Sequence, residues 1–255
     1  MKDKITRLWA TKTKDDEWWS SFVTAPLAIA ANYFAVDVPA ITPNRITAAS
    51  FAIAVVASIG ILAGGLGWFV AAAVLIQISH VLDCMDGQMA RYRKVSSPFG
   101  SYLDRLTDQV QVTLWFGAVG YAAYAQSLSA VPVFLAMIGI AFYGLRGYVK
   151  YIALEIETSL DPDYPAKLAQ QRHREPSAGL GFGATANVKW FFCEQPKILD
   201  FDEGVFVFML SAALILDQLT PMLWIFAASQ VFWGAQKAWR HGMNIDANRK
   251  LSIQK

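Results

Sequence analysis

Six stretches of mainly apolar residues run along the chain, separated by polar connections of very different length. They extend approximately over Ile46–Gly64, Gly67–Arg91, Phe99–Tyr124, Val131–Ala153, Glu203–Asp217 and Pro221–Lys237. Most of them reach the roughly 20 residues that a helix needs to cross a bilayer. The fifth is shorter and needs extra length from residues 197–202, or a tilt. The pattern predicts an all-α membrane protein with six transmembrane helices.

Composition supports a bilayer as the surrounding medium. Hydrophobic residues make up 55% of the 255 residues and charged residues only 16%, whereas soluble domains have about 45–50% and about 25%. The net charge of +2 gives no reason to expect nucleic-acid binding. Cys84 and Cys193 lie far apart and form no CxxC pair, so a disulfide framework is not expected.

The basic residues divide the connections into two sets. None of the 22 Lys and Arg residues lies in the short connections at 64–67, 125–130 and 218–221. All of them fall before the first span, around the turn at Arg91–Lys94 and Arg105, in the stretch from Arg146 to Lys197 and in the tail from Lys237. The positive-inside rule places that second set in the cytoplasm. Six spans with both termini cytoplasmic satisfy every connection.

The N-terminal segment, residues 1–41, has a pattern of its own. Apolar residues between Trp18 and Phe34 are interrupted by Ser, Thr, Pro and Asn, and a charged stretch precedes them. This predicts an amphipathic helix lying in the membrane interface, with the tryptophans at headgroup depth. The alternative is a seventh span. We expect residues 42–240 to form the six-helix domain, with a cytoplasmic loop at about 154–200, and residues 241–255 to form a cytoplasmic tail.

Four aspartates lie at the cytoplasmic ends of the second and third spans. Asp83 and Asp86 are three residues apart, and Asp104 and Asp108 are four apart, so each pair shares one helix face. The short turn at 95–98 makes the two helices antiparallel neighbours. We therefore expect the four carboxylates to converge.

Such a cluster in a region of low dielectric is costly unless the carboxylates are protonated or neutralised by cations. Oxygen ligands favour hard ions such as Mg²⁺ and Mn²⁺, and two such ions form a clamp suited to displacement at phosphorus. Arg91, Arg93, Lys94 and Arg105 stand beside the cluster and suit a pyrophosphate. A single Asp at a helix end usually caps it or forms an ion pair, but four at this spacing indicate a functional site.

The spacing resembles the signature of the CDP-alcohol phosphatidyltransferases, which include phosphatidylinositol-phosphate, phosphatidylglycerol-phosphate and phosphatidylserine synthases. The chain reads Asp83-x-x-Asp86-Gly87-x-x-Ala90-Arg91 and then, after eight residues, Gly100-x-x-x-Asp104-x-x-x-Asp108. All eight signature positions are present. The six-span layout is also similar to that family, so the resemblance covers roughly Thr42–Lys237.

The resemblance implies a reaction and roles for particular residues. The reaction is metal-dependent transfer of a substituted phosphate from a CDP-linked donor to a hydroxyl, with release of CMP. Mg²⁺ or Mn²⁺, as two ions, would be held by Asp83, Asp86, Asp104 and Asp108, and Asp108 would also be the general base. The nucleotide would be bound by Asn44, Asp83, Gly87, Ala90, Arg91 and Gly100. The family also implies a homodimer.

The acceptor site has weaker signals. Arg146 and Lys150 lie four apart at the cytoplasmic end of the fourth span, and with Arg105 they are candidates to bind an anionic acceptor. Lipid-headgroup anchoring or simple positive-inside placement is the alternative. The long loop adds Arg172, His173, Arg174 and Lys189. The basic pair favours CDP-diacylglycerol as donor and a polar acceptor; the alternative is a soluble CDP-alcohol with a lipid acceptor.

Two other classes of function compete with the enzyme. A cation transporter would place its acidic residues near the bilayer midplane, often on pseudo-repeats. A non-catalytic membrane scaffold would not need all four aspartates. His80, one turn before Asp83, is interpreted as a packed or capping histidine, and Cys84 as a packing residue. We expect a multi-pass protein of a bacterial inner membrane whose active site faces the cytoplasm.

Overall fold

The structure, a computed structural model, describes residues 2–12, 17–172, 188, 191–192, 198, 201 and 203–253. Every regular element in these ranges is a helix, so the expected all-α class is confirmed. The helices are α1 (Lys2–Trp9), the π-helical turn η1 (Ser20–Thr24), α2 (Ala25–Ala35), α3 (Pro43–Ala63), α4 (Leu66–Arg93), α5 (Pro98–Ser127), α6 (Val131–Leu160), α7 (Tyr164–Arg172), α9 (Glu203–Ile215) and α10 (Leu219–Ile253).

Three of the described helices are long and apolar enough to cross a membrane. They are α3 with 21 residues, α4 with 28 and α6 with 30. The other expected spans also form helices, namely α5, α9 and α10. With 13 residues, α9 is about 20 Å long, which is short for a span, as the sequence predicted. The count of six spans stays a prediction.

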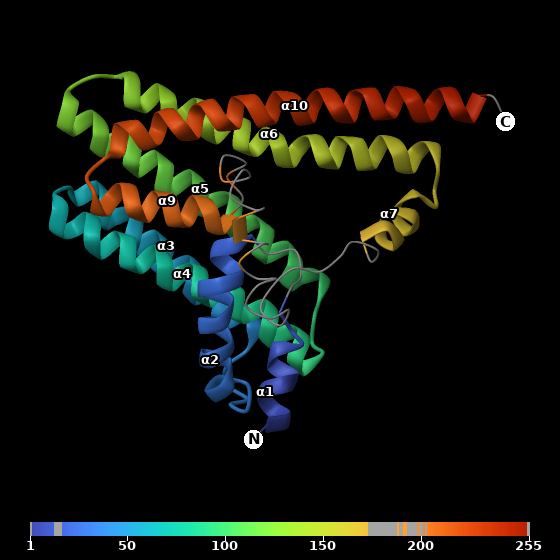
Figure 1. The fold of residues 1–255 in the computed structure, drawn as a ribbon, viewed down its shortest axis with the longest axis horizontal. Coiled ribbons are helices and arrows are strands. Elements are labelled where there is room, and N and C mark those ends of the chain that lie inside the picture. Colours follow the sequence, from blue (N-terminus) through green and yellow to red (C-terminus); the bar gives the residue numbers. More distant parts are fainter. Residues whose placement is uncertain are drawn as a thin grey trace.

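The helices form a bundle that opens toward one end (Figure 1). α3, α4 and α9 lie side by side, and α5 connects them to the pair formed by α6 and α10. α6 and α10 run next to each other beyond the ends of the other helices, with α7 attached to the far end of α6. α1 and α2 pack at the opposite end of α4 from the connection to α3.

Small residues bring α5, α6 and α10 into close contact. The rings of Phe116 and Phe226 stack with centroids 3.6 Å apart, and both side chains are fully buried. A Cβ added at Gly139 would lie 2.3 Å from the Phe226 ring, and one at Gly120 would lie 2.7 Å from the Cβ of Ala136. Gly120 therefore packs against α6 of the same chain.

Local signals set the turn that joins α4 to α5. α4 ends at Lys94, which adopts the left-handed conformation with φ 57°. The Ser97 hydroxyl accepts a hydrogen bond from the Gly100 amide at 3.0 Å, and Pro98 occupies the first turn of α5. The two helices run in opposite directions, as predicted (Figure 1), but they are not the close neighbours that the sequence suggested, because α5 packs mainly against α3.

Two helices extend into the segments that were expected to form a loop and a tail. α6 continues to Leu160, so the loop expected from residue 154 begins later and contains α7. α10 continues to Ile253, through most of the segment expected to be a tail. The reason is that α6 and α10 pack against each other, which keeps their polar ends helical.

The N-terminal segment is docked on α4. Asn32 donates hydrogen bonds to the Met85 carbonyl at 2.9 Å and to the Gln88 side chain at 3.2 Å. Gln88 in turn donates to the Ala25 carbonyl at 3.1 Å. Ala28 and Asn32 are fully buried. Residues 20–35 thus form part of the folded protein, while their position in a membrane interface stays a prediction.

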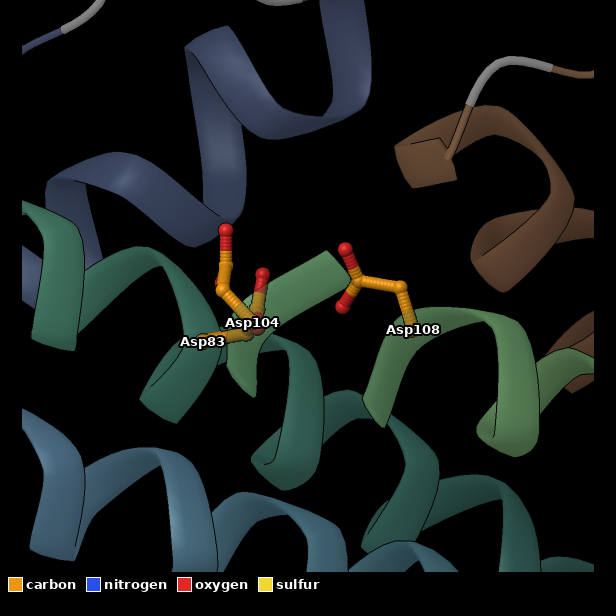
Figure 2. A group of neighbouring side chains, drawn as sticks. All are labelled: Asp83, Asp104 and Asp108. Carbon is orange, nitrogen blue, oxygen red and sulfur yellow. The ribbon is translucent and has the colours of Figure 1, made fainter. Parts of the chain in front are cut away.

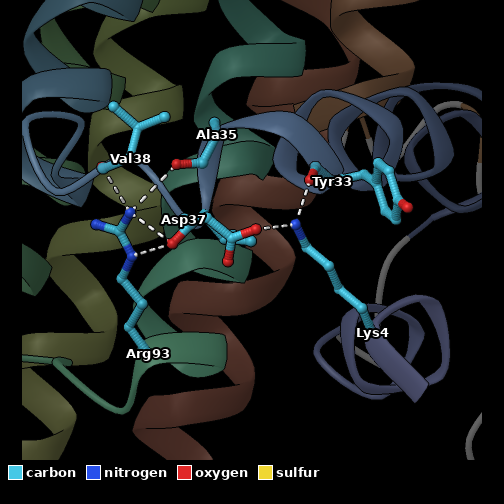
Figure 3. A network of polar contacts seen from close by, with 7 residues as sticks. Lys4, Tyr33, Ala35, Asp37, Val38 and Arg93 are labelled. Atoms are coloured by element: carbon cyan, nitrogen blue, oxygen red, sulfur yellow. Dashed lines mark hydrogen bonds and ion pairs between the residues drawn. The ribbon is translucent and has the colours of Figure 1, made fainter. Parts of the chain in front are cut away.

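Arg93 holds the C-terminal end of α2 (Figure 3). Its guanidinium donates hydrogen bonds to backbone carbonyls of residues 35, 36, 38 and 41 at distances between 2.5 and 3.2 Å. From the other side, Lys4 donates to the Tyr33 carbonyl at 2.6 Å and forms an ion pair with Asp37. Arg93, which the sequence placed beside the acidic cluster, instead fixes the segment that leads into α3.

Candidate active site

Three aspartates from two helices meet at the centre of the candidate site (Figure 2). Asp83 comes from α4, and Asp104 and Asp108 come from successive turns of α5. One carboxylate oxygen of each lies within 4.8 Å of the others. The Oδ1 atom of Asp108 is buried and has no hydrogen-bond partner among the described residues. A buried oxygen of this kind calls for a cation or a proton donor.

The fourth aspartate lies beside this group rather than in it. Asp86 is buried and accepts a hydrogen bond from the hydroxyl of Thr47, which belongs to α3. Its side chain lines the same cavity as Asp83 and Asp104. The expected convergence therefore involves three carboxylates directly, with the fourth held at their side by α3.

A cavity of about 310 Å³ opens over the acidic group. Its walls come from the N-terminal segment, the start of α3, the second half of α4, the turn at 95–97 and the first turns of α5. The six residues expected to bind a nucleotide all line it: Asn44, Asp83, Gly87, Ala90, Arg91 and Gly100.

Two glycines keep space in this cavity. A Cβ at Gly100 would lie 3.2 Å from the side-chain oxygen of Asn44, and one at Gly87 would lie 3.1 Å from the guanidinium of Arg91. Larger residues at these positions would press on two of the expected nucleotide-binding side chains. Arg91 is itself held in place, since its Nε donates to the Thr11 carbonyl at 2.7 Å.

The donor set fits a hard divalent cation. Asp83, Asp104 and Asp108 offer only carboxylate oxygens, which Mg²⁺ and Mn²⁺ prefer. The buried Oδ1 of Asp108 gives a second, independent indication. When bound, such an ion neutralises negative charge on phosphate oxygens.

Sequence reasoning did not identify one wall of the cavity. Glu17 and Ser20 of the N-terminal segment and His80 of α4 line it. The Ser20 hydroxyl lies 2.5 Å from Glu17 Oε1 and 3.0 Å from His80 Nε2. His80 could have been suggested by its place one turn before Asp83. Nothing in the local pattern around Glu17 indicates its location.

The expected acceptor residues lie elsewhere. Arg146 lines a second pocket of about 400 Å³ between α6 and α10, together with Trp233, Gln236, Lys237, Arg240, His241 and Asn244. This pocket shares no lining residue with the first cavity. Lys150 and Arg105 are exposed, and neither lines either pocket. The side chains of Arg172, His173, Arg174 and Lys189 lie outside the described residues, as does Cys193.

The second pocket is strongly basic. Arg146 donates to the buried Gln230 side chain at 3.0 Å. The pKa of His241 is lowered, first by burial and then by the positive charges of Lys237, Lys150 and Arg240. Lys150 therefore lies near this pocket although it does not line it, and the pocket favours an anion.

Comparison with known proteins agrees with the site. Residues 40–170, just over half of the chain, match the profile of the family described as CDP-alcohol phosphatidyltransferase. The chain belongs to the CDP-alcohol phosphatidyltransferase family. In this CDP-alcohol phosphatidyltransferase, the matched range contains every residue expected to bind metal or nucleotide. Glu17, Ser20 and the residues of α10 that line the second pocket lie outside it.

Two relatives cover part of the same region. The "Inner membrane protein YnjF" of Escherichia coli (strain K12) is 34% identical over 133 residues, which is 51% of this chain and 61% of that protein. The "Bifunctional IPC transferase and DIPP synthase" of Thermococcus kodakarensis is 26% identical over 99 residues, or 39% of this chain and 22% of that protein. The chain thus spans less than two thirds of either relative. With its three membrane-length helices, the likeness to YnjF supports a membrane protein.

Proposed function

We propose that this CDP-alcohol phosphatidyltransferase transfers a substituted phosphate from a CDP-linked donor to the hydroxyl of a polar acceptor and releases CMP. The observation that carries the proposal is the group of three carboxylates from α4 and α5 beside a cavity lined by seven of the eight signature residues, all except Asp108. Helices long enough to span a bilayer favour a lipid donor, CDP-diacylglycerol.

The cytidine end of the donor would lie against the glycines. Gly87, Ala90 and Gly100 leave room for the nucleotide, and the side chain of Asn44 faces the space that Gly100 keeps open. Arg91, which also lines the cavity, supplies a positive charge for the diphosphate. This arrangement would hold the diphosphate above the acidic group.

The chemistry would take place over the aspartates. Asp83, Asp86, Asp104 and Asp108 would hold Mg²⁺ or Mn²⁺, as two ions. The acceptor oxygen would form a bond to the phosphorus distal to cytidine while the bond from that phosphorus to the bridging oxygen breaks. CMP would leave with that oxygen, and the acceptor proton would pass to Asp108, whose buried Oδ1 lacks another partner among the described residues.

The remaining assignments belong to the same proposal. Arg146 and Lys150 would attract an acceptor that carries an anionic group, because the pocket beside them is basic. Arg105, exposed on α5 near Asp104, would add a further positive charge. Residues 42–240 would form the catalytic domain. The enzyme would be a homodimer of a bacterial inner membrane, with its cavity open to the cytoplasm.

The proposal is tested by CMP release from purified enzyme in lipid nanodiscs, with Mg²⁺, Mn²⁺ or chelator. CDP-diacylglycerol is offered with serine, glycerol 3-phosphate, inositol or inositol phosphate. Asp108→Asn is expected to abolish release, whereas Asp161→Asn, an exposed residue paired with Lys167, keeps it. Release only from a soluble CDP-alcohol with diacylglycerol would reverse the donor assignment. If CMP is released from neither class of donor, the proposed enzymatic activity is wrong.

A further inference from the structure

The wall formed by Glu17, Ser20 and His80 faces the same cavity as the acidic group. Ser20 and His80 are almost completely buried, with 5% and 4% of their surface exposed. His80 lies three residues before Asp83 on α4, so the two side chains share one helix face. The wall therefore stands one helical turn from the proposed reaction centre.

The direction of the hydrogen bonds determines what this wall offers. The Ser20 hydroxyl has one proton, which it donates to Glu17 Oε1. His80 Nε2 must then carry a proton and donate it to the Ser20 oxygen. An ionised Glu17 has no proton to donate. The wall thus presents acceptor oxygens to the cavity and suits a ligand that brings hydrogen-bond donors.

The carboxylate of Glu17 lies at the start of α9. A Cβ at Gly204 would lie 1.9 Å from Glu17 Oε1, so the carboxylate rests against the first turn of α9. Negative charge is favourable at a helix N-terminus, and the Ser20 hydroxyl adds a hydrogen bond. The start of α9 and the Ser20 hydroxyl therefore both lie beside this carboxylate.

The wall is also rigidly held. Trp19 donates from its indole to Gln77 at 3.1 Å, and Gln77 donates to the Ser211 hydroxyl of α9 at 2.9 Å. The rings of Trp18 and Trp19 both pack on Phe208, with centroids 5.2 and 4.7 Å away. These contacts attach the N-terminal segment to α4 and α9 together. A preorganised wall of this kind can select a ligand at low entropic cost.

We propose that Glu17 and Ser20 bind the hydroxyl groups of the acceptor, which is a polyhydric alcohol that is uncharged at the end facing this wall. His80 acts as a positioning residue that fixes the Ser20 oxygen. If the acceptor carries a phosphate, Glu17 repels that group. The phosphate then lies away from Glu17, toward the basic residues proposed above, Arg105, Arg146 and Lys150. The inference rests on the proposed function, because it names the acceptor class of the same cavity.

The test measures steady-state constants for the nanodisc enzyme with Glu17→Gln, Ser20→Ala and the control Ser21→Ala. Ser21 is a buried serine of the same π-helical turn that accepts a hydrogen bond from Lys12 and does not line the cavity. Loss of a hydrogen bond to a polar or charged group is expected to raise the acceptor KM about tenfold. The donor KM and the Mg²⁺ dependence should stay as in the wild type and in Ser21→Ala.

A second measurement needs no variant and covers the case in which the variants do not fold. Inositol and cyclohexanol, which share a six-membered ring but differ in the number of hydroxyls, are tested as competitors of the acceptor on the wild-type enzyme. We expect the inhibition constant of inositol to be at least about tenfold lower than that of cyclohexanol, because inositol can form several hydrogen bonds with the wall. Equal competition, or serine as the preferred acceptor, would overturn the inference.

The two proposals fail in different ways. If the wild type releases CMP but Glu17→Gln and Ser20→Ala raise the donor KM instead, or change neither KM, the acceptor wall is wrong and the enzyme assignment stands. If the wild type neither binds CDP in the presence of Mg²⁺ nor releases CMP, the proposed function itself is wrong.

Discussion

Thr47 of α3 donates a hydrogen bond from its hydroxyl to the carboxylate of Asp86 on α4. Both side chains are buried. The bond links the start of α3 to the acidic cluster. It also restricts rotation of the Asp86 carboxylate, which could otherwise turn toward other partners. Thr47 thus sets the orientation of a proposed metal ligand without binding the ion itself.

Removing that hydroxyl is expected to weaken metal binding. Thr47→Val keeps the shape of the side chain, and loss of a partner that orients a metal ligand typically costs about 10–100-fold in affinity. Titration of CMP release with Mg²⁺ should show a higher half-saturating concentration in Thr47→Val and a near-normal one in Thr47→Ser. Identical curves for all three proteins would show that Asp86 does not depend on Thr47.

A side chain at position 100 is expected to disturb nucleotide binding. The Cβ of Gly100→Ala would lie 3.2 Å from the Asn44 oxygen, closer than usual packing allows. We expect the donor KM to rise while thermal stability changes little. Gly117→Ala is the control in the same helix, since no atom lies within 4 Å of its added Cβ. A donor KM unchanged in Gly100→Ala would argue against a nucleotide at this position.

The contact between α6 and α10 predicts a strong effect on stability at one glycine. Gly139→Ala would place a Cβ 2.3 Å from the Phe226 ring, which is stacked on Phe116 and has no room to move. Overpacking of this kind costs about 1–3 kcal/mol. Thermal unfolding in detergent should show a lower Tm for Gly139→Ala than for Gly147→Ala, a change in the same helix that meets no atom within 4 Å.

Replacement of Arg93 by lysine is expected to loosen the segment between α2 and α3. Its guanidinium reaches four backbone carbonyls at once, and a lysine cannot reproduce that fork of donors. Arg93→Lys should make the segment between α2 and α3 more sensitive to limited proteolysis. Arg45→Lys is the control, because Arg45 donates to only the Ala40 carbonyl among the hydrogen bonds described. Equal cleavage rates for both variants would contradict this role.

The sequence predicted the elements whose signals are local. The spacing of Asp83 and Asp86, and of Asp104 and Asp108, places each pair on one helix face, and the turn at 95–98 lets carboxylates of both helices meet although α5 packs mainly on α3. The sequence did not predict that Arg93 would turn away from the cluster, because its partners are backbone carbonyls of the segment after α2.

Other features depend on residues far apart in the chain. Glu17 and Ser20 join the cavity through contacts with His80 and Gly204, and no local pattern encodes such pairings. Arg146 was expected to bind an anionic acceptor, and the sequence did not indicate that α6 would carry it into a separate pocket with α10. Helix lengths were also underestimated at Leu160 and beyond residue 240, since the pairing of α6 with α10 stabilises polar turns that would not be helical alone.

The docking of the N-terminal segment also orders the biogenesis of the protein. Residues 17–20 leave the ribosome early, but Gln77 and His80 follow some sixty residues later and Gly204 only after most of the chain has been made. The three carboxylates of α4 and α5 are therefore made before α9, while the contact of Glu17 with Gly204 is still missing. Only when α9 has been made can Glu17 take up its final contact, so a nascent chain that stalls before α9 carries the proposed metal ligands with the N-terminal wall of the cavity incompletely held.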